Sequence, residues 1–173
     1  LHLILGFSAG AVVGVAFFDL LPESLTLTAG AHDVAFTTSI VALGFVLFMI
    51  LDRFVVGHGH VSEEHCENHE HRGRLGAGSL SIHSFLDGLA IGFAFQVSSA
   101  VGIVVTIAVL AHDFSDGINT VSLILKSGGS KKTAFKWLLV DALAPVLGII
   151  ATLFVTVTDT TLGTLLALFT GFF

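Results

Sequence analysis

Long apolar runs, separated by short polar stretches, dominate the pattern of this chain. The runs cover about 3–21, 36–56, 77–96, 100–125, 134–157 and 161–173. The first five have roughly the 20 residues that an α-helix needs to cross a bilayer, and the last is shorter. No run shows the strict apolar–polar alternation of a membrane β-barrel strand. The pattern therefore predicts an all-α, polytopic membrane helix bundle, with residues 1–173 forming a single transmembrane domain.

The composition supports a membrane protein. Of the 173 residues, 54% are hydrophobic and only 12% are charged, whereas soluble domains carry about 25% charged residues. The mean hydropathy is +0.95. The 19 glycines fit this class, because Gly lets membrane helices approach one another closely. The chain begins at Leu1 and stops at Phe173 inside an apolar run, so we expect it to be part of a longer protein.

Basic residues indicate the orientation of the bundle. They lie in or beside two connections, at about 57–76 and 126–133, and the other connections have none. With alternating crossings, these two connections emerge on one side, which the positive-inside rule assigns to the cytoplasm. We expect a multi-pass protein of the cell membrane. The basic residues are Arg53, Arg72, Arg74, Lys126, Lys131, Lys132 and Lys136.

One phrase occurs twice inside the apolar runs. Residues 83–88 read HSFLDG and residues 112–117 read HDFSDG. A spacing of four places His83 and Asp87 on one helix face, and likewise His112 and Asp116. The connection near residue 98 is short, so the two helices should be antiparallel neighbours. Both His lie about 21–23 Å from that turn at 1.5 Å per residue, and we expect them at one depth.

The chemistry of these phrases favours a metal site. Ionisable residues at membrane depth are costly and usually mark an ion or substrate path. Imidazole and carboxylate together suit Zn²⁺, with Fe²⁺, Mn²⁺ and Cd²⁺ as alternatives. Asp113 and Asn119 extend the polar face around Asp116, enough for a second ion bridged by Asp87 and Asp116. The alternative is a structural network in which His–Asp hydrogen bonds tie the two helices together.

Two further groups of polar residues lie in or beside apolar runs. Asp141 precedes Pro145 by four residues, and this proline frees the carbonyl of Asp141. An ion site there and a plain kink with Asp141 paired to Lys136 are equally open. Asp19, Pro22 and Glu23 end the first run, which we place at the outer face. They form either a polar helix end or an entrance for cations.

A histidine-rich stretch precedes the third run. Residues 58–71 read HGHVSEEHCENHEH and form part of the predicted cytoplasmic loop at about 57–76. Tracts of His with Cys bind transition metals loosely, although a single cysteine fits no closed zinc finger. The loop can therefore receive, buffer or sense ions; a solvated loop with incidental His is the alternative. The candidate ligands are His58, His60, His65, Cys66, His69 and His71.

These motifs resemble those of the ZIP metal transporters. HSFLDGLAIG resembles the fourth-helix motif of that family and HDFSDG the fifth, while FSAGAVVGVAFFDLLPES and GTLLALFTGFF resemble its second and seventh helices. The resemblance implies eight helices, of which this chain supplies the second into the seventh. It also implies first-site ligands at His83, Asp87, His112 and Asp116, and second-site ligands at Ser84 and Asp113.

The chain departs from the family pattern at several positions. Asp87 and Asp116 stand where Glu is usual, and Ser84 stands where Asn is usual. On the run at 134–157, Ala144 occupies the place before proline where the family often has Glu, and Asp141 lies one turn earlier. These departures concern the second site and the metal preference more than the fold.

The leading hypothesis is transport of divalent transition-metal ions, with Zn²⁺ first, toward the cytoplasm; the direction rests on the resemblance. The main alternative is a membrane-embedded zinc-dependent hydrolase, which would need an open metal position and a general base. A metal sensor that binds through the histidine-rich stretch is a third possibility. We expect no enzymatic activity, no organic cofactor and no nucleic-acid partner. The sequence leaves the oligomeric state open, with a homodimer as one option.

Overall fold

The computed structural model describes residues 2–57 and 67–172, and all regular elements in this part are helices. The all-α prediction is confirmed. In chain order these elements are α1 (His2–Val15), the π-helix η1 (Ala16–Leu20), α2 (Leu21–Thr28), α3 (Val34–Gly57), α4 (Glu67–Val97), α5 (Ser99–Lys126), α6 (Lys131–Thr152) and α7 (Asp159–Phe172).

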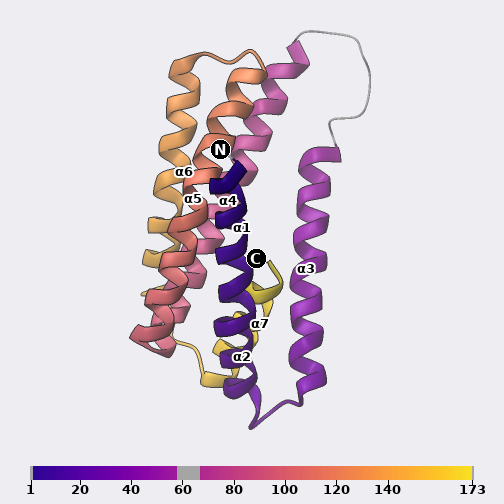
Figure 1. The fold of residues 1–173 in the computed structure, drawn as a ribbon, viewed down its shortest axis with the longest axis vertical. Coiled ribbons are helices and arrows are strands. Elements are labelled where there is room, and N and C mark those ends of the chain that lie inside the picture. The colour runs from indigo at the N-terminus through magenta and orange to yellow at the C-terminus, as the bar shows by residue number, and fades with distance from the viewer. Residues whose placement is uncertain (1, 58–66, 173) are drawn as a thin grey trace.

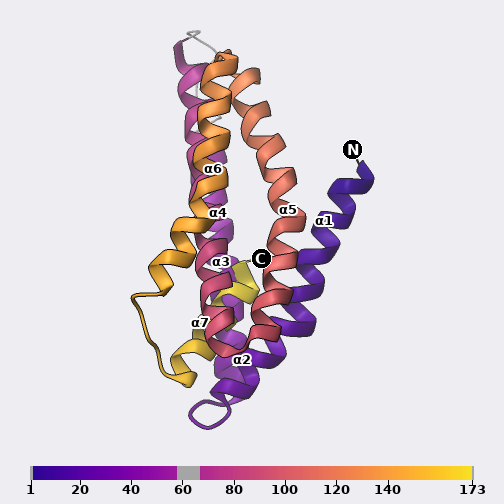
Figure 2. The ribbon, with the colours of Figure 1, turned by 90° about the vertical axis from the view of Figure 1, so that its left-hand side faces the viewer.

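The long helices alternate in direction along one axis (Figure 1). The α5–α6 connection lies at one end, together with the start of α4, and α3 runs toward the same end. We call this the basic end, because it carries Lys126, Lys131 and Lys132. The α2–α3, α4–α5 and α6–α7 connections lie at the opposite end (Figures 1 and 2). This alternation agrees with the predicted emergence of both basic connections on one side.

Four helices of the described part are long and apolar enough to cross a membrane, namely Ala9–Thr28, Gly73–Val97, Ser99–Lys126 and Lys131–Thr152. The apolar part of α3, Val34–Ile50, is shorter, and α7 has 14 residues. Large apolar side chains such as Phe45, Ile107 and Leu147 are exposed on the outer faces of these helices. Such faces suit contact with lipid tails, so the fold is that of a membrane helix bundle.

Three helix boundaries differ from the sequence prediction. The first helical segment continues through Pro22 to Thr28. Pro22 falls in the first turn of α2, where its missing N–H costs little. The π-helix η1 shifts the hydrogen-bond register just before it. Asp19 therefore lies inside the segment. Helix α4 already begins at Glu67, so residues 67–76 of the predicted loop are helical.

Helix α6 ends at Thr152, several residues before the end of its apolar run. The side-chain amide of Gln96 on α4 donates hydrogen bonds to the carbonyls of Thr152 and Val155, both at 3.0 Å. A helix end leaves few backbone donors for the last carbonyl groups. The carbonyl of Thr152 accepts from the N–H of Val155 as well as from Gln96, and Gln96 also reaches a carbonyl just beyond the end. A side chain 56 residues away thus helps to fix where α6 ends.

Helix α4 lies at the centre of the bundle and packs against α6 at backbone distance. A Cβ atom added to Gly88 would collide with the carbonyl oxygen of Pro145, and one added to Gly148 would collide with that of Phe85. Helices α3 and α7 pack in the same manner at Gly44 and Gly171. Small residues at both crossings therefore set the separation of the helices.

We expect Gly148→Ala to lower the free energy of unfolding by about 1–3 kcal/mol, because the new methyl group must push α6 away from α4. Gly14→Ala is the matched control, since a Cβ at Gly14 has nothing within 4 Å. Equilibrium unfolding of the purified full-length protein in mixed detergent micelles measures both. Equal stability of the two variants would contradict the close packing.

Candidate metal centre

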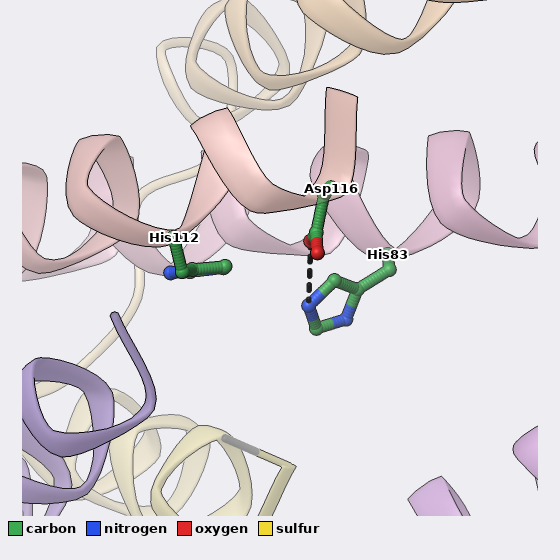
Figure 3. A group of neighbouring side chains, drawn as sticks. All are labelled: His83, His112 and Asp116. Atoms are coloured by element: carbon green, nitrogen blue, oxygen red, sulfur yellow. Dashed lines mark ion pairs between the residues drawn. The ribbon is translucent and has the colours of Figure 1, made fainter. Parts of the chain in front are cut away.

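The two repeated phrases meet between α4 and α5. His83 and Asp87 lie on α4, and His112, Asp113 and Asp116 lie on α5. The imidazole rings of His83 and His112 have centroids 5.8 Å apart. The predicted proximity of the two His is confirmed. Figure 3 shows Asp116 and His83 directed toward one another, with His112 beside them on α5.

The distances between nitrogen and oxygen atoms approach those around a bound metal ion. Asp87 Oδ2 lies 3.2 Å from His112 Nε2 and 3.5 Å from His83 Nε2, and Asp116 Oδ2 lies 3.9 Å from His83 Nε2. Ligand atoms about 2.0–2.2 Å from a tetrahedral zinc ion are about 3.3–3.6 Å from one another. Small side-chain movements therefore suffice to close these atoms around an ion.

The cluster contains two overlapping ligand groups. One comprises His83, His112 and Asp116, and the other Asp87, His112 and Asp113. Within each group the potential ligand atoms all lie within 4.8 Å of one another. Asp87 is only 1% exposed, and its Oδ1 atom has no hydrogen-bond partner among the described residues, as is also true of Asp113 Oδ1. Buried oxygens without partners favour a cation at this place.

The orientation of His112 suits metal binding through Nε2. Its Nδ1 lies 3.1 Å from the carbonyl oxygen of Ala108. Because a carbonyl can only accept, Nδ1 carries the hydrogen, and the lone pair of the neutral ring is left on Nε2. This nitrogen points at Asp87. Ligating His residues commonly donate their other N–H group in this way.

Asp141 occupies a separate buried position beside the cluster. Its Oδ1 accepts a hydrogen bond of 3.0 Å from Ser84 on α4, and its Oδ2 one of 3.2 Å from Thr120 on α5. The carboxylate is 4% exposed. In the described part of the chain it forms no ion pair with Lys136, which is exposed. The arrangement ties α6 to α4 and α5.

Asn119 lies apart from the cluster, although it shares a helix face with His112. Its side chain is exposed. It lies about two turns further along α5 toward the basic end. His112 itself lines a small cavity together with Val12 and Val15 of α1.

Other predicted residues are only partly described. His58, His60, His65 and Cys66 lie outside the described residues, while His69 and His71 lie in the helical backbone at the start of α4. Asp19 and Glu23 are partly exposed and do not join either ligand group.

Three residues near the site are missing from the sequence prediction. Thr120 follows Asp116 by four residues, a spacing that could have placed it on the same face. Phe48 on α3 and Phe172 on α7 both contact the ring of His83. Nothing in their local sequence distinguishes these two from the other 14 phenylalanines.

Comparison with known proteins places the chain in a family. The model of the ZIP zinc transporter family matches residues 58–173. The chain is 28% identical to zinc transporter YKE4 of Saccharomyces cerevisiae over 166 residues, covering 86% of the chain and 47% of that protein. It is 27% identical to zinc transporter zipt-7.1 of Caenorhabditis briggsae over 208 residues, covering 90% and 53%.

A shorter match is closer in sequence: zinc transporter zipt-7.2 of Caenorhabditis elegans is 43% identical over 72 residues, or 42% of the chain and 16% of that protein. No solved structure matches significantly. The chain thus spans about half the length of the first two relatives. Because the family model matches well over half of the chain, the protein belongs to the ZIP zinc transporter family.

Proposed function

We propose that this chain forms part of a transporter that moves divalent transition-metal ions, Zn²⁺ first, across the cell membrane toward the cytoplasm. The observation that carries the proposal is the buried cluster of imidazole and carboxylate groups between α4 and α5. The names of the relatives support zinc as cargo. A hydrolase has no such support, and the family membership favours transport over catalysis.

His83, Asp87, His112 and Asp116 are the proposed ligands, with Asp113 available to a second ion. Each carboxylate at membrane depth costs roughly 2.5–3.5 kcal/mol on insertion scales. A divalent cation offsets this cost for two carboxylates at once, so the cluster is better satisfied with an ion than without. Ser84 and Asp141 face each other rather than the two ligand groups, and we assign them to the tie between helices.

Transport then follows from alternating exposure of the cluster. The ion exchanges bound water for imidazole and carboxylate atoms, which match its preferred ligands. We propose that the basic end faces the cytoplasm, as the positive-inside rule requires. The histidine-rich residues 58–71 would meet the ion on that side, where they can receive or buffer it.

Removal of single ligands tests the transport proposal. We expect His83→Ala and Asp116→Ala to lower Zn²⁺ uptake at least about tenfold, since changes even outside the ligand set commonly cost that much. Uptake is measured with the full-length protein in proteoliposomes. His32→Ala and Asn119→Ala are controls, because both residues are exposed and outside the cluster. Wild-type uptake by both ligand variants would refute the proposal.

A second comparison separates ligands from the helix tie. Asp116→Asn should weaken Zn²⁺ binding to the purified protein about tenfold or more. Asp141→Asn should change it by no more than about threefold, because the new amide keeps a carbonyl acceptor for one hydroxyl group. Competition with a fluorescent chelator measures both affinities. A similar loss in the two variants would make Asp141 a ligand and overturn this assignment.

Deletion of residues 58–71 distinguishes a transporter from a sensor, because it removes every candidate ligand of the histidine-rich stretch. If the cluster carries the ion through the membrane, the deletion variant keeps measurable Zn²⁺ flux into vesicles, since every proposed membrane ligand is retained. A sensor that binds metal only through this stretch would lose its whole response. Complete loss of flux, in a variant whose circular dichroism shows that it still folds, would contradict transport through the cluster.

A further inference from the structure

The ring of His83 lacks the hydrogen bond that usually orients a ligating histidine. Its Nδ1 atom is buried and has no hydrogen-bond partner among the described residues. His112 differs, because its Nδ1 contacts the carbonyl of Ala108. Metal-binding histidines almost always use the second nitrogen in this way, which fixes both the tautomer and the ring plane. Some other contact must hold the His83 ring in place.

Two phenyl rings contact His83. The ring of Phe172 stacks on it, with centroids 5.9 Å apart and planes inclined by 19°. The ring of Phe48 is tilted by 53° at 6.1 Å. The two phenyl rings also contact each other edge to face, at 5.3 Å and 72°. Offset stacking and edge-to-face contacts at these separations are the favourable arrangements of aromatic pairs.

Phe48 and Phe172, which we call the phenyl pair, lie on helices that supply no proposed ligand. Helices α3 and α7 cross in backbone contact, because Gly44 and Gly171 leave room for the carbonyls of Leu168 and Val41. Phe48 follows Gly44 by one turn, and Phe172 is adjacent to Gly171. Helix α7 ends midway along the bundle in both views (Figures 1 and 2), and there its Phe172 contacts His83. The glycine crossing therefore sets the two rings side by side.

We propose that Phe172 and Phe48 are positioning residues for metal binding. They hold the imidazole of His83 so that Nε2 faces Asp87 and Asp116, and they replace the hydrogen bond that this ring lacks. The inference rests on the proposed role of His83 as a ligand. It makes the two histidines unequal: α5 fixes His112 through its own backbone, whereas α3 and α7 fix His83 from outside.

The proposal is tested by the Zn²⁺ affinity of the purified full-length protein. Phe172→Ala should weaken binding by about 3- to 10-fold, the equilibrium equivalent of one aromatic pair. Phe172→Leu should weaken it similarly, because it keeps apolar volume and loses the ring face. Phe172→Tyr should bind within about twofold of wild type, since it keeps the ring. Phe45→Ala is the control, as Phe45 lies on α3 and is 55% exposed.

A double-mutant cycle shows whether Phe172 acts through His83. In the His83→Ala background, Phe172→Ala should cause no further loss of affinity. Multiplied losses in the double variant, or wild-type affinity in Phe172→Leu, would overturn the inference. If His83→Ala alone left Zn²⁺ binding unchanged, the proposed ligand set would fail instead, so the two failures are distinguishable.

The same cycle with Phe48→Leu provides a second test if the Phe172 variants do not fold. Thermal unfolding in detergent identifies that case. Phe48→Leu should weaken binding only while His83 is present. A loss that persists without His83 would assign the phenyl pair to general packing and overturn the inference.

Discussion

Asp87 is 1% exposed and lies within 3.5 Å of two imidazole nitrogens. Water cannot reach this carboxylate, and a charge in apolar surroundings must be neutralised or paired. Its available partners are the two histidines, from two different helices, and any cation that they share with it. This requirement is met where α4 and α5 meet at His83 and His112, and the packing of the surrounding helices keeps Asp87 buried.

Close helix packing also creates a second buried carboxylate, whose neighbours differ from those of Asp87. Gly88 and Gly148 let α4 and α6 touch, and Asp141 of α6 thereby reaches Ser84 and Thr120. Hydroxyl groups donate hydrogen bonds but carry no charge to exchange. Asp87 instead faces groups that can bind or release a cation. Both carboxylates are buried, so the chemistry of their neighbours, more than burial, distinguishes a carboxylate that suits an ion from one that connects helices.

The sequence predicted the cluster because its geometry is local. A spacing of four aligns each His with its Asp, and one short turn near residue 98 sets the register between the helices. The hydrogen bond from Ser84 to Asp141 joins residues 57 positions apart and depends on how α4 packs on α6, which no local pattern encodes. Asn119 shares a helix face with His112 yet is exposed, because the helical period does not tell how far a neighbouring helix covers that face. The hydropathy pattern also did not predict that α4 begins at Glu67, since hydropathy indicates which residues suit lipid and not which residues are helical.

Backbone contacts between helices and ring contacts with His83 differ in how strongly they hold the groups around the cluster in place. Closing His83 and Asp116 on an ion would shorten their separation by about half an ångström, a change that side-chain rotation supplies. Separating α4 from α6, or α3 from α7, would break backbone contacts that glycines make possible. The contact of Phe48 and Phe172 with His83 consists only of rings. Ring contacts of this kind are worth about 0.5–1.5 kcal/mol each beyond their buried area. The contact of these two rings with His83 is therefore weaker than either of the two backbone crossings.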